Sequence, residues 1–100
     1  MRKYVTEFIG TFGLVFTVGA AVMSKAALAP LAIGFTVFAG AASVGNISGG
    51  AFNPAVALGA SVMGLFSWSN IWIYLLADFA GGAAAALAFR YLNPGDLRRA

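Results

Sequence analysis

The chain carries one short motif whose residue types suit an encounter with a small polar molecule, Asn53-Pro54-Ala55. Asn is a good helix N-cap, and Pro suits the first helical position because its missing N–H would be unpaired there anyway. The motif therefore predicts a helix that begins at Pro54. The positive end of the helix dipole and the two N–H donors of the Asn53 amide would then lie at one point. We expect Asn53 both to cap this helix and to donate a hydrogen bond to a passing molecule.

The other polar residues form no catalytic or metal-binding set. The sequence has no His and no Cys, and its three carboxylates, Glu7, Asp78 and Asp96, do not pair at a useful spacing. No His or Cys is therefore available as a base, nucleophile or metal ligand. Gly49-Gly50 leads to Phe52-Asn53 and not to a Lys, so there is no phosphate-binding loop. We expect no enzyme activity, no cofactor and no metal.

Composition indicates an integral membrane protein. Hydrophobic residues make up 61% of the chain, charged residues 9%, and the mean hydropathy is +0.89. Soluble domains carry about 25% charged residues. The net charge is +3, and the basic residues gather near the chain ends, where they would meet lipid headgroups and not nucleic acid.

Three segments are predicted to cross a bilayer, for which about 20 residues suffice; the second is short unless it is extended. They are residues 4–24, residues 31–45 with a possible extension back to 26, and residues 71–92. Residues 46–52 are Gly-rich and predicted to be non-helical. Residues 54–64 would form a helix about 16 Å long at about 1.5 Å per residue, half of a hydrocarbon core of about 30 Å. The prediction is an all-α fold of three transmembrane helices and one re-entrant half-helix. Residues 1–100 would form a single repeat with its ends on opposite sides.

Small residues mark the expected packing faces, because helices in lipid associate through close approach. They are Gly10 and Gly13, Gly34 and Gly40, and the ladder of Ala77, Gly81 and Ala85. Asp78 either lies close to the polar turn at residues 67–70, which we favour, or hydrogen-bonds the re-entrant loop.

Two segments resemble the aquaporin and aquaglyceroporin family, the major intrinsic proteins: Thr6-Glu7-Phe8-Ile9-Gly10-Thr11, and Ile47-Ser48-Gly49-Gly50-Ala51-Phe52-Asn53-Pro54-Ala55-Val56. The resemblance covers essentially the whole chain and corresponds to one of the two inverted repeats of such proteins. It implies a fold in which two half-helices meet at their Asn-Pro-Ala ends. One repeat of this kind would be completed by an inverted second copy.

The resemblance also implies roles for individual residues. Glu7 would tie down backbone N–H groups of the re-entrant loop and not handle protons. The narrow filter would be formed by Ile33 or Ala41 together with Gly50 and Val56. The family's second repeat usually has Arg where Val56 stands, and His is common where Asn46 and Ala51 stand. Backbone carbonyls that cannot all pair in a helix would accept hydrogen bonds from permeating molecules, namely those of Asn46, Ile47, Ser48, Gly49, Gly50 and Ala51.

The function predicted from these features is a passive channel for water and small neutral, glycerol-like solutes. The pore would be formed by an antiparallel homodimer in the lipid bilayer, and four dimers are implied by analogy. Basic residues are nearly balanced: Arg2 and Lys3 on one side, and Lys25, Arg90, Arg98 and Arg99 on the other. That weak bias suits insertion in both orientations. The expected location is the cell membrane, plasma or inner. Two alternatives are a non-conducting subunit or truncated remnant that pairs with a full-length relative, and a channel for dissolved gas.

Overall fold

The computed structural model describes residues 1–95, and its secondary structure is helical. The elements are α1 (Arg2–Met23), α2 (Ala29–Ser48), α3 (Pro54–Val62), the short 3-10 helix η1 (Trp68–Asn70) and α4 (Ile71–Leu92). Asp96, Arg98 and Arg99 lie outside the described residues. The longest dimension is 42 Å, comparable with a bilayer of about 40–45 Å including headgroups.

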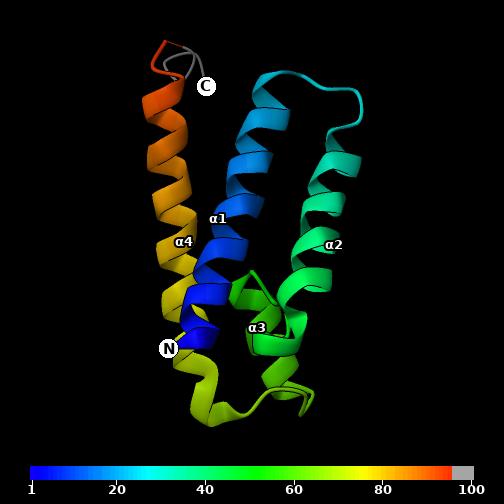
Figure 1. Cartoon of the computed structure of the whole chain (residues 1–100), viewed down its shortest axis with the longest axis vertical. Helices are drawn as coiled ribbons and strands as arrows, with labels where there is room; N and C mark the ends of the chain where they lie inside the picture. Colours follow the sequence, from blue (N-terminus) through cyan, green and yellow to red (C-terminus); the bar gives the residue numbers. More distant parts are fainter. Residues whose placement is uncertain (96–100) are drawn as a thin grey trace.

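The three long helices run side by side, and α1 packs against both α2 and α4 (Figure 1). All three are long and apolar enough to cross a membrane. The start of α1 and the end of α4 lie toward opposite ends of the bundle (Figure 1). The all-α, three-span prediction is therefore confirmed.

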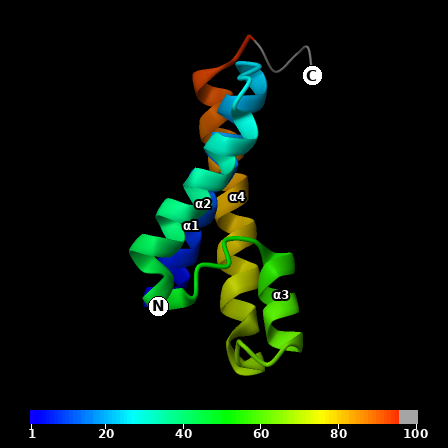
Figure 2. The same cartoon turned by 90° about the vertical axis from the view of Figure 1, so that its right-hand side faces the viewer.

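The short helix α3 is the re-entrant element. The segment after α2 crosses toward α4 and rises along the long axis, where α3 begins and runs back toward the end it came from (Figure 2). α3 packs against α4. Nine residues at about 1.5 Å each give a helix of about 14 Å, which is about half of the hydrocarbon core.

Local capping residues explain most helix boundaries. Pro30 lies in the first turn of α2, and Pro54 opens α3 with Asn53 as its cap. Asn93 ends α4, so the predicted third span of residues 71–92 is reproduced at both ends. The first span begins two residues earlier than predicted, and α3 ends two residues earlier.

One boundary differs in a way that affects the site. Residues 46–52 were expected to be non-helical, but α2 continues through Ser48 and only residues 49–53 are irregular. The helix ends at Gly49, whose φ of +90° is the left-handed C-terminal conformation that Gly adopts without strain. A side chain there would also collide with the ring of Phe66, 2.7 Å from the position of a Cβ. Asn46, Ile47 and Ser48 thus belong to the last turn of a helix.

The predicted ladder on α4 is a helix-packing face. Ala77, Gly81 and Ala85 are all buried, and a Cβ on Gly81 would lie 2.6 Å from the carbonyl oxygen of Phe8. α1 and α4 therefore approach closely at this level, as small residues permit in lipid. Gly34 on α2 differs, because no atom lies within 4 Å of its Cβ position.

Candidate functional site

Asn53 caps α3 and keeps its amide donors available. Its backbone is extended, and its Oδ1 accepts a hydrogen bond from the backbone N–H of Ala55 at 2.8 Å. Because the oxygen faces the helix, the side-chain NH₂ is left to meet other groups. The side chain is exposed, so the positive end of α3 and two amide donors face the same open space.

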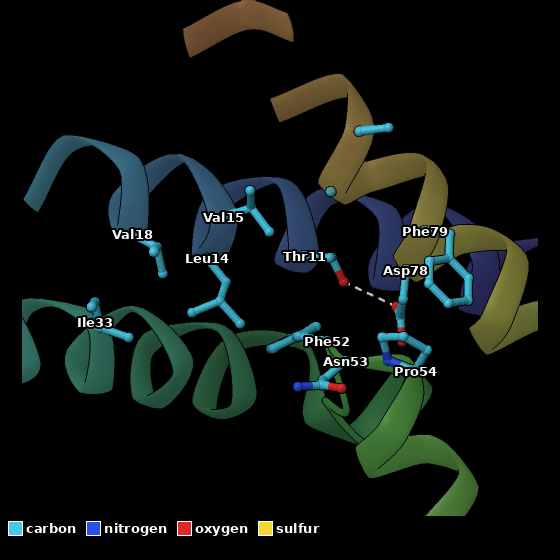
Figure 3. A pocket seen from close by; sticks show the side chains of 12 residues that line it. Thr11, Leu14, Val15, Val18, Ile33, Phe52, Asn53, Pro54, Asp78 and Phe79 are labelled. Atoms are coloured by element: carbon cyan, nitrogen blue, oxygen red, sulfur yellow. Dashed lines mark hydrogen bonds between the residues drawn. The ribbon is translucent and has the colours of Figure 1, made fainter. Parts of the chain in front are cut away.

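A groove of about 670 Å³ runs past this point (Figure 3). Its walls come from α1, α2, α4 and the start of α3, and most of its side chains are aliphatic or aromatic. Three polar residues interrupt them: Thr11, Asn53 and Asp78. A few placed polar groups on an apolar wall are typical of small-molecule sites.

Glu7 holds the irregular segment from behind. Its carboxylate is fully buried and accepts a hydrogen bond from the Phe52 N–H at 2.9 Å and another from the Ser48 hydroxyl at 2.7 Å. The Ser48 hydroxyl in turn accepts from the Gly50 N–H at 3.2 Å. One side chain of α1 thereby satisfies the buried Phe52 N–H directly and fixes Ser48, which in turn bonds Gly50.

The Phe52 side chain holds residues 49–53 in place by packing between α1 and α2. The sequence alone did not predict this role of Phe52. Its side chain is 2% exposed, although its φ of +52° is unusual for a residue other than Gly. The ring fills the space that Gly10 of α1 and Gly40 of α2 leave open, since a Cβ on either would collide with it. These two glycines therefore make room for a loop side chain and not for a neighbouring helix. An aromatic residue beside the motif, with glycines in both flanking helices, was the available signal.

Asp78 does not lie near the polar turn, as favoured from the sequence. It is 1% exposed, two turns inside α4, and accepts a hydrogen bond from the Thr11 hydroxyl at 3.0 Å (Figure 3). Its neighbours include Glu7 and the backbone of Asn53. The close approach of α4 to α1 carries this carboxyl into the interior beside the loop.

The four filter candidates fall in different places. Ile33 lines the groove together with Asn53. Gly50 faces Ala41, whose Cβ lies 3.3 Å from the position of a Cβ on Gly50. Val56 is 52% exposed on the first turn of α3. A single chain thus brings Ala41 and Gly50 together and leaves Val56 uncovered.

The carbonyls proposed to line a pore are also distributed over two kinds of backbone. Those of Gly49, Gly50 and Ala51 lie in the irregular segment. The carbonyls of Asn46, Ile47 and Ser48 belong to the end of α2, and that of Ser48 accepts the Tyr74 hydroxyl. Because Tyr74 is buried, the Ser48 carbonyl faces α4 and not a pore.

Comparison with known proteins gives a consistent match. The sequence profile of the family described as "Major intrinsic protein" matches residues 1–89. Aquaporin TIP1-1 of Arabidopsis thaliana is 39% identical over 94 residues, covering 89% of this chain and 37% of the relative. Probable aquaporin TIP2-2 of Oryza sativa subsp. japonica is 43% identical, covering 88% and 37%. Aquaporin TIP1-2 of Zea mays is 40% identical, covering 96% and 39%.

Two consequences follow from these alignments. The chain spans less than two fifths of the length of the relatives it matches. A multi-pass membrane location agrees with the three apolar helices, whereas the expected assignment to the cell membrane finds no support among these relatives.

Proposed function

Because the chain belongs to the major intrinsic protein family, we propose that it forms half of a passive channel for water and small neutral solutes. A second copy, inserted in the opposite orientation, supplies the other half. Channels of this family are not enzymes, in agreement with the absence of His and Cys from the sequence.

One observation carries the proposal: an amide donor at the start of a half-length helix stands in the wall of an apolar groove. The Asn53 NH₂ donates to the oxygen of a passing water, and the positive end of α3 orients that water. Leu14, Val18 and Ile33 on the facing walls offer no competing hydrogen bond. Water can therefore bind at one point without being held along the whole path.

A second unit is needed because the groove is open in one copy. Asn53 and Phe79, which both line it, are exposed. An exposed amide in hydrocarbon is costly, so a protein surface or water must cover it. An inverted copy related by an axis in the membrane plane brings a second α3 start against the first. Both helix N-termini then repel cations at the centre of the pore.

The outer face of α2 suits such a contact. Of the 20 residues of α2, only Ser48 is buried. Gly34 has open space at its Cβ position, so a helix of the second copy can approach the backbone there. Four such dimers would give the tetramer of pores implied by analogy.

The groove and filter positions favour permeation by neutral solutes larger than water. The proposed filter consists of Gly50 and Val56 with either Ile33 or Ala41, and none of these has a charged or donating side chain. A filter without Arg is wider and more apolar, so glycerol-like molecules pass along with water. Carbonyls of Gly49, Gly50 and Ala51 accept hydrogen bonds from them.

The competing function is a non-conducting subunit that pairs with a full-length relative through the same open groove. Stopped-flow light scattering of vesicles that contain only this chain separates the two. The channel predicts faster osmotic water flux than in empty vesicles and measurable glycerol entry. An Asn53→Leu variant, which removes the amide at similar volume, is the matched control and should lose most of this flux. Parent vesicles no more permeable than empty ones would refute the homodimeric channel.

A further inference from the structure

The interior of the bundle contains a carboxyl group with an unsatisfied oxygen. Asp78 is 1% exposed, and its Oδ1 accepts the Thr11 hydroxyl. Among residues 1–95, its Oδ2 has no hydrogen-bond partner. A bare carboxylate oxygen away from water carries a large desolvation cost. Something must therefore satisfy this atom.

One candidate partner is a second carboxyl group. The Asp78 side chain interacts directly with that of Glu7. Thr11, which bonds Asp78, lies one turn after Glu7 on the same face of α1. The close approach of Gly81 to Phe8 holds the two helices together at this level. The helix packing thus brings two acids together in the interior of the bundle, where both are buried.

The hydrogen bonds indicate which carboxyl group, that of Glu7 or that of Asp78, can carry a proton without losing a donor. Both oxygens of Glu7 already accept hydrogen bonds, from the Phe52 N–H and the Ser48 hydroxyl, so a proton on Glu7 would compete with one of these donors. Asp78 has a free oxygen. Two adjacent carboxylates would also repel each other strongly in a medium of low dielectric constant.

We propose that Asp78 is protonated at Oδ2 and donates this proton in a hydrogen bond to the Glu7 carboxylate, so that Asp78 positions the re-entrant loop through Glu7. The acid pair then carries one negative charge and its hydrogen bonds are complete. Thr11 donates to Asp78, Asp78 donates to Glu7, and Glu7 receives the Phe52 N–H and the Ser48 hydroxyl.

Within residues 1–95, Glu7 is the one charged group that acts on Asp78. The titratable groups facing Asp78 are Glu7 from α1 and Tyr74 from its own helix; the Tyr74 hydroxyl donates to the Ser48 carbonyl. The start of α3 contributes an uncharged donor, the backbone N–H of Asn53, which also faces the Asp78 carboxyl. Loss of the shared proton would create two adjacent carboxylates directly behind the loop.

Infrared spectroscopy of the full chain in lipid tests the proton directly. At neutral pH the parent should show the carbonyl band of a protonated carboxylic acid. Heavy-isotope labelling of the aspartate carboxyls should shift this band, and labelling of glutamate, of which Glu7 is the only one, should not. Absence of the band, or a band that moves with the glutamate label, would overturn the proposal. No variant is needed for this test.

Variants then show which residue gives the infrared band and whether its proton affects water permeability. Asp78→Asn should lose the band and still fold, because the amide can donate to Glu7 and accept from Thr11; Asp96→Asn is the matched control and should keep it. A band lost in the control contradicts the assignment. If the proposed channel function holds, parent water permeability falls at alkaline pH while that of Asp78→Asn stays constant. An equal alkaline loss in both refutes the positioning role, and vesicles without water flux refute the channel without affecting the infrared result.

Discussion

Replacing Gly10 by Ala tests whether the Phe52 ring holds the re-entrant loop. A Cβ at Gly10 would overlap three atoms of the ring, all nearer than 3.0 Å. The ring is 2% exposed and also fills the space beside Gly40, so it cannot move aside freely. Overpacking of this kind costs about 1–3 kcal/mol, which corresponds to a factor of about 5 to 150 in an equilibrium constant.

Gly13→Ala is the matched control, because it lies on the same helix and its Cβ would make only an ordinary contact of 3.9 Å with Thr36. Both variants gain the same helix propensity, about 0.5–1 kcal/mol, so their difference isolates the overlap. Thermal or denaturant unfolding in detergent measures that difference. Gly10→Ala combined with Phe52→Leu should recover much of the loss, as contacting residues couple. If Gly10→Ala proves as stable as Gly13→Ala, the ring does not occupy this space.

Four further changes address the loop, the pore centre, the filter and the orientation. Glu7→Gln should lower unfolding stability by about 1–3 kcal/mol, because the charged acceptor of two buried donors is lost; an unchanged unfolding midpoint would contradict the network. Asn53→Asp should admit cations in a vesicle ion-flux assay, and ion exclusion equal to that of the parent would show that Asn53 does not line the pore. Val56→Arg should reduce glycerol flux more than water flux, and a ratio of the two fluxes equal to that of the parent would show that Val56 does not line the pore. Two added Lys at one end should fix the orientation and abolish flux, and mixing oppositely fixed forms should restore it; an active fixed form would exclude the antiparallel dimer.

The parts of the fold that sequence predicts well are those set by local chemistry. Asn53-Pro54 specifies a helix start by itself, because the cap and the fixed φ of Pro act within one turn. Asn93 ends α4 where expected. The end of α2 was misplaced by three residues, since the Gly-rich composition suggested irregular backbone while the helix needed only one Gly, at position 49, to stop.

The side chains that support the site depend on contacts between distant segments. Asp78 was placed near a turn from its position in the span, and only the approach of α4 to α1 brings it beside Thr11 and Glu7. Phe52 was an unremarked neighbour of the motif. Nothing local indicates that its ring enters a gap between Gly10 and Gly40, because that gap exists only after two helices have paired.

Because the gap for the Phe52 ring exists only after α1 and α2 have paired, the helices and the loop must assemble in a fixed order. The space that receives the Phe52 ring has one wall on α1 and the other on α2, and the two helices are joined by the short connection between Met23 and Ala29 and by the hydrogen bond from Thr36 to Thr17. The helical hairpin must therefore insert and close before the loop can settle. Until then the backbone of residues 49–53 cannot donate to Glu7, and the Phe52 ring has no gap between helices to fill. A chain whose first hairpin does not close is therefore expected to leave its re-entrant loop unpacked.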